Sequence, residues 1–109
     1  MGPAATVNRW VLTAAVTERS ALRYTPAGLP VLDLVLSHES LVTQEGQARK
    51  VSLQVKALAI GAMSDRASKL ALGVPTEFAG FLATSRNGRG LTFHITEVLA
   101  PAQAQSAHQ

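Results

Sequence analysis

Alternation of apolar and polar residues, interrupted by turn-forming residues, runs through most of this chain. It is clearest in residues 51–57, where Val, Leu, Val and Ala alternate with Ser, Gln and Lys. Successive side chains of a strand point to opposite faces, so this period predicts a strand with one buried face. The residues expected to point inward are Val51, Leu53, Val55 and Ala57, and those expected to point outward are Ser52, Gln54 and Lys56.

Two earlier segments carry the same signal. The residues expected on the buried face of the first are Trp10, Leu12, Ala14 and Val16, and those of the second are Leu32, Leu34 and Leu36. Between them, residues 19–30 contain Thr-Pro-Ala-Gly and a second proline, which indicates a turn-rich connection. A polar stretch at residues 43–47 is expected to form the next loop.

The periodicity changes after residue 60. Met63, Ala67 and Leu70 recur at helical spacing, and a glycine at 73 followed by Pro75 is a stop signal, so we expect a helix over about 62–72. Two more strands are expected over 76–83 and 91–99. The intervening Asn87-Gly88 pair favours positive φ at two central turn positions and predicts a hairpin.

Three strands, a helix and two strands is the element order of an all-β, five-stranded OB-fold barrel with a short helix between strands 3 and 4. Periodicity alone also allows another small α+β fold. We expect one OB-fold domain over residues 7–100, a flexible N-terminus over 1–6 and a flexible tail over 101–109.

Composition narrows the class of protein. The 109 residues suit one domain, and the absence of cysteine fits a reducing cytoplasm. No apolar run approaches the roughly 20 residues that cross a bilayer, and no signal peptide is visible, so we expect a cytoplasmic protein with no membrane contact. Residues 40–94 carry seven basic and three acidic side chains, a net charge of +4, which favours polyanionic partners.

Two segments carry a family resemblance. Asn-Arg-Trp-Val-Leu at 8–12, followed by Leu-Arg-Tyr-Thr-Pro-Ala-Gly-Leu-Pro-Val at 22–31, resembles the start of bacterial single-stranded DNA-binding proteins. Leu-Val-Leu-Ser-His-Glu-Ser at 34–40 and Gly-Phe-Leu at 80–82 continue the match. Within that superfamily the chain resembles the PriB family (primosomal replication protein N), because it stops at Gln109 without a long acidic-tipped tail and has one tryptophan.

The resemblance implies a function and partners. A PriB protein is a homodimer that binds single-stranded DNA at stalled forks within the replication restart primosome. It stimulates the PriA helicase, helps to recruit DnaT and works beside the general single-stranded DNA-binding protein. All of these are expectations for this chain.

A protein that binds a single strand without reading its sequence needs cations for the phosphates and flat side chains for the bases. OB folds place them on strands 2 and 3 and on the loops between strands 1–2 and 4–5. The candidate DNA-binding residues are Arg23, Tyr24, Arg49, Lys50, Lys56, Phe81, Arg86, Arg89 and Phe93.

Each candidate also has an ordinary structural explanation. Arg86 and Arg89 suit a solubilising loop tip, and Tyr24 suits packing over the barrel mouth. The three basic residues at 49, 50 and 56 suit solvated charges that protect an edge strand. Phe81 and Phe93 suit the core or a dimer interface.

Three positions depart from the pattern of the family. Ser52 and Gln54 stand where relatives tend to carry an aromatic residue, and Glu39 stands where a basic residue favours DNA. A stacked base is worth about 1–3 kcal/mol. We therefore expect weaker, more charge-dependent DNA binding than in aromatic-rich relatives.

No catalytic, metal or cofactor site is expected. His38, His94 and His108 are scattered without ligand spacing, and neither a phosphate-binding loop nor Gly-x-Ser-x-Gly occurs. The chain is therefore predicted not to be an enzyme. Two alternatives to a restart factor stay open: a tailless general single-stranded DNA-binding protein, and an OB domain that docks onto proteins and binds little DNA.

Overall fold

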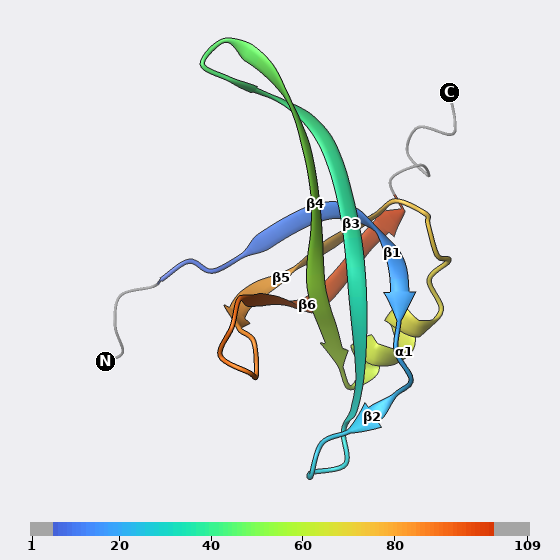
Figure 1. The fold of residues 1–109 in the computed structure, drawn as a ribbon. Helices are drawn as coiled ribbons and strands as arrows, with labels where there is room; N and C mark the ends of the chain where they lie inside the picture. The colour runs from blue at the N-terminus through green and yellow to red at the C-terminus, as the bar shows by residue number, and fades with distance from the viewer. Residues whose placement is uncertain (1–5, 102–109) are drawn as a thin grey trace.

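The computed structural model describes residues 6–101 (Figure 1). The elements are β1 (Trp10–Arg19), β2 (Arg23–Tyr24), β3 (Pro30–Gln44), β4 (Gln47–Ile60), α1 (Ala62–Ser68), β5 (Thr76–Thr84) and β6 (Leu91–Pro101). The predicted flexible termini fall outside the described residues except at Thr6 and at Pro101, which ends β6. Within residues 6–101, no helix has the length and apolar character needed to span a bilayer.

The strands close into a barrel. Their order is β1-β5-β6-β4-β3, with β2 added beyond β3, and an additional β1–β3 pairing joins the ends. β4 and β6 run parallel, and the other pairs are antiparallel. With one short helix between β4 and β5, this is the predicted five-stranded OB barrel, β2 being a two-residue addition within the turn-rich connection.

β1 closes the barrel because it pairs with two neighbouring strands, β5 and β3. Its first half, to Ala14, pairs with β5, and its second half, from Ala15, pairs with β3. His38 lies at this fork, where its Nδ1 is 2.6 Å from the carbonyl oxygen of Thr13 and its Nε2 is 2.9 Å from Ser40 Oγ. The imidazole thereby supplies a hydrogen bond to the Thr13 carbonyl, beside the point where β1 leaves β3.

The barrel interior contains the predicted apolar faces. Ala14, Val16 and the leucines at 32, 34 and 36 are all at most 3% exposed, which confirms the first two strands. Phe78 and Phe93 are the bulkiest fully buried side chains. Trp10 packs against this core, with its ring centroid 5.8 Å from that of Phe93. Burial of each such large apolar side chain contributes about 1.5–3 kcal/mol.

Gly80 is required by a close approach of two strands. A Cβ at this position would lie 1.8 Å from the carbonyl oxygen of His94 on β6. The pairing of β5 with β6 shifts register between Ala79 and Gly80, so the backbones meet at a bulge. Only a residue without a side chain fits there.

The β3–β4 hairpin extends well beyond the barrel as a long two-stranded arm (Figure 1, green). The prediction that Leu53 points into the core is therefore wrong: it is 36% exposed, because its side of the arm has passed the end of the barrel. The chain reverses within the expected segment 43–47, but the loop is shorter than predicted, since pairing continues to Gln44↔Gln47. Glu45 and Gly46 form the turn, with φ of 53° and 75°, as a tight two-residue hairpin requires.

The helix and the last hairpin both form where predicted but differ from the prediction in detail. α1 ends at Ser68, four residues earlier than predicted. The Arg19 guanidinium donates hydrogen bonds to the carbonyls of Ala67, in the last turn of α1, and Leu70, just after it. The predicted β5–β6 hairpin is confirmed, but the positive φ expected at Asn87 is not found. The loop of the hairpin spans residues 85–90.

Candidate nucleic-acid interface

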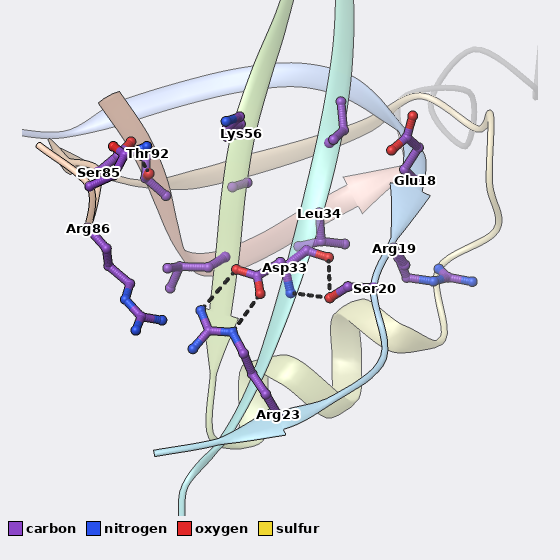
Figure 2. Close-up of a pocket in the computed structure, with 14 residues that line it drawn as sticks. Glu18, Arg19, Ser20, Arg23, Asp33, Leu34, Lys56, Ser85, Arg86 and Thr92 are labelled. Carbon is purple, nitrogen blue, oxygen red and sulfur yellow. Dashed lines mark hydrogen bonds and ion pairs between the residues drawn. The ribbon is translucent and has the colours of Figure 1, made fainter. Parts of the chain in front are cut away.

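A groove of about 580 Å³ crosses the outer face of β3 and β4 (Figure 2). The β1–β2 connection bounds it on one side and the β5–β6 loop on the other. This is the face on which OB folds bind oligonucleotides. Its lining includes four basic and two acidic side chains: Arg19, Arg23, Lys56, Arg86, Glu18 and Asp33.

Arg23 and Asp33 form an ion pair on this face. Arg23 Nε lies 2.7 Å from Asp33 Oδ2, and Nη2 lies 3.1 Å from Oδ1, so two parallel hydrogen bonds join them. These bonds lower the pKa of Asp33 and raise that of Arg23, and the nearby Arg86 lowers the pKa of Asp33 further. Both side chains remain over one-third exposed. The carboxylate is therefore charged and open to solvent within an otherwise basic groove.

Lys56 and Arg86 add two cations to the same groove. Lys56 projects from the outer face of β4, opposite Val35, and Arg86 extends from the β5–β6 loop toward the Arg23–Asp33 pair (Figure 2). Neither cation has an ion-pair partner among the described residues. Arg19 differs, because it is held by carbonyl groups at and just after the end of α1.

Tyr24 does not share this face. β2 pairs Arg23 with Val31 and Tyr24 with Pro30, and adjacent residues of a strand point to opposite sides. Arg23 therefore faces the groove, whereas Tyr24, 65% exposed, lies on the other side of β2 and is absent from the lining.

The arm separates the two neighbouring cations at positions 49 and 50. Lys50 is opposite Leu41 and lies an even number of residues from Lys56, so both project from the outer face. Arg49 is opposite Val42 and projects from the other face. Arg89 lies in the β5–β6 loop, where its backbone N–H donates to Asn87 Oδ1, and it does not line the groove.

Of the two candidate phenylalanines, the structure leaves one accessible. Phe93 is 0% exposed within the core, so the prediction of a base contact there is wrong. Phe81 is 39% exposed and stacks on His94, with ring centroids 4.7 Å apart and planes 13° from parallel. Sequence reasoning missed His94 and Asp33, because their contacts depend on strand register that residue patterns alone do not fix.

The described residues offer no metal centre. Within 6–101, no three His, Cys, Asp or Glu side chains lie close enough together to hold an ion. The groove has the chemistry of an ion-pairing and hydrogen-bonding surface.

Comparisons with known proteins agree with the fold. A family profile described as "Another single-strand binding protein family" matches residues 8–97. The chain is 42% identical over 80 residues to the replication restart protein PriB of Bordetella pertussis, covering 73% of this chain and 75% of that protein. It is 40% identical over 77 residues to the PriB of Neisseria meningitidis, covering 70% and 76%.

A solved structure gives the same result. The PriB protein of Ralstonia solanacearum superposes with a TM-score of 0.79 at 35% identity, over 87% of this chain and 98% of that one. The profile match, the relatives and the shared barrel together show that this chain belongs to the PriB family of the single-strand-binding superfamily.

Proposed function

We propose that this protein binds single-stranded DNA in the groove over β3 and β4 and acts in replication restart. The observation that carries the proposal is the groove itself, in which basic side chains from β1, β2, β4 and the β5–β6 loop line the ligand-binding face of an OB barrel. The family membership agrees, since relatives are named replication restart proteins.

In this proposal Lys56 and Arg86 make the main phosphate contacts, because neither forms an ion pair with an acidic side chain among residues 6–101. Arg23 donates its Nε and Nη2 to Asp33, which offsets its charge, so only its remaining N–H groups are available to a phosphate while the pair is intact. Lys50 on the outer face of the arm and Arg89 on the loop would extend the contact. Ser52 and Gln54, on the same face as Lys56, offer no stacking surface. Binding therefore depends on charge and is weaker than in aromatic-rich relatives.

The finer part of the proposal follows the family. We infer that the protein is a cytoplasmic homodimer that binds DNA at stalled forks, stimulates a PriA helicase and helps to recruit DnaT, beside the general single-stranded DNA-binding protein. None of these roles requires catalysis by this chain.

The first test is fluorescence anisotropy of a labelled dT oligonucleotide over a salt series. A single strand loses affinity with a logarithmic slope of about 0.7 per neutralised phosphate. Arg86→Gln should weaken binding and lower that slope by about 0.7. Lys69→Gln at the C-cap of α1, outside the groove, is the matched control. Absence of binding by the wild-type protein at low salt would exclude the DNA-binding proposal.

A protein-docking OB domain is the second candidate. It is favoured by the carboxylate of Asp33, which neutralises Arg23, and by the lack of an aromatic residue at 52 or 54. This alternative predicts no DNA binding at low salt together with stimulation of unwinding by a purified PriA helicase. A tailless general binder, in contrast, should coat long single strands and form tetramers.

A further inference from the structure

A second cluster of side chains lies beside the groove, on the outer face of β5 and β6. It consists of the stacked rings of Phe81 and His94 and the guanidinium of Arg9. We propose that this cluster, named here the β5–β6 platform, binds one further nucleotide, with the base stacked on Phe81 and a phosphate on Arg9. The inference rests on the proposed DNA binding and extends the path of the strand.

Strand register connects the platform to the groove. Asp33 is paired with Leu58, Leu58 with His94 on the parallel strand β6, and His94 with Phe81 on β5. Directly paired residues share one face of a sheet, so this row runs continuously across four strands on the outside of the barrel. Asp33 and Leu58 line the groove, and the rings therefore begin where its lining ends.

The two rings form a preorganised surface. His94 covers Phe81 in a near-parallel stack, and yet Phe81 keeps 39% of its surface exposed. A base stacked on a fixed ring orders little additional protein, which lowers the entropic cost of binding. On the β3–β4 face, the corresponding outward positions hold Ser52 and Gln54, so a base there finds no ring.

Arg9 supplies the cation at the end of the row. The register Trp10↔Gly80 places residue 9 opposite Phe81. Asn8 maintains that register, because its side chain both donates to the Leu82 carbonyl at 2.9 Å and accepts from the Leu82 N–H at 3.1 Å. The Arg9 guanidinium reaches Glu97 on β6 at 3.5 Å, and both side chains are more than half exposed. Such a pair contributes little energy, so a phosphate can replace the carboxylate.

The test is Phe81→Leu, which keeps an apolar side chain and removes the ring. Its matched control is Tyr24→Leu, the same loss of an exposed ring on the other side of β2. Affinity for a dT oligonucleotide should fall about tenfold in Phe81→Leu and stay within about twofold in Tyr24→Leu. Arg9→Gln should lower the salt slope by about 0.7.

A second readout separates stacking from charge. An abasic deoxyribose-phosphate oligomer of the same length retains the phosphates and lacks the bases. The wild-type protein should prefer dT to this oligomer, and Phe81→Leu should reduce that preference about tenfold. Thermal melting and light scattering of each variant check that the fold and the molecular mass are unchanged.

Three results have distinct meanings. If the wild-type protein binds dT and Phe81→Leu binds it equally well, the platform is excluded and the groove remains. If Phe81→Leu changes the molecular mass, the face is a contact between copies of the chain and the platform is overturned. If the wild-type protein binds no DNA at low salt, the proposed function itself fails.

Discussion

The Asp33 carboxylate opposes DNA binding from within the groove. It accepts two hydrogen bonds from one edge of Arg23, offsets the charge of that guanidinium, and adds a negative charge to the groove that Lys56 and Arg86 also line. Asp33→Asn should therefore tighten dT binding about three- to tenfold at low salt and steepen the salt slope by about 0.7, as Arg23 becomes available to a phosphate. Asp65→Asn on α1, the same change outside the groove, should have no effect. Weaker binding by Asp33→Asn would mean that the pair positions Arg23 for DNA.

The same pair gives a pH dependence of stability with a defined sign. Because the pKa of Asp33 in the folded protein lies below its unfolded value of about 3.9, the pair stabilises the fold above that pH. The contribution is lost as the pH falls through the lowered pKa. Urea titrations should show wild type and Asp33→Asn converging in stability below about pH 4. The difference at neutral pH should be at most about 1 kcal/mol, since both side chains are exposed.

Gly80 is the residue where substitution should damage the fold most directly. Gly80→Ala places a methyl group against the His94 carbonyl, and the contacted atoms are backbone atoms of β6, which cannot move aside as a flexible side chain can. We expect a loss of about 2–4 kcal/mol in the free energy of unfolding, measured by urea denaturation. Gly88→Ala is the comparison, since its Cβ meets nothing within 4 Å and only its φ of 78° opposes the change. An equal effect at both positions would contradict the packing argument.

At the scale of elements, the β3–β4 arm divides its charges between two faces. Lys50 projects from the outer face with Lys56, and Arg49 projects from the other face. Lys50→Gln should therefore lower the salt slope of dT binding by about 0.7, and Arg49→Gln should leave it unchanged. The reverse result would show that the strand follows the inner face of the arm.

At the scale of the whole molecule, the oligomeric state distinguishes a PriB-type restart factor from a general single-stranded DNA-binding protein. A PriB-type protein should be a dimer of twice the 11.5 kDa chain, and a general binder should be a tetramer. Multi-angle light scattering at several concentrations measures this directly. A tetramer that coats long dT would contradict a role as a replication restart factor and support a role as a general single-stranded DNA-binding protein.

Much of the barrel follows from residue patterns. The alternation in residues 10–17 and 32–37 identifies the buried faces of β1 and β3, because a half-buried strand must repeat every second residue. The same alternation fails to predict that Leu53 is exposed. Its pattern is that of a core strand, but whether a partner covers that face depends on how far the hairpin extends past the barrel.

The basic character of the site follows from the sequence by itself, since Arg23, Lys56 and Arg86 lie on the strand and loops that an OB fold uses for ligands. Only the tertiary structure decided which candidates share a face. It turned Arg23 toward Asp33 and Tyr24 away, buried Phe93 and paired Phe81 with His94. The physical reason is register: a shift of one residue between paired strands reverses every side chain, and composition carries no information about that shift.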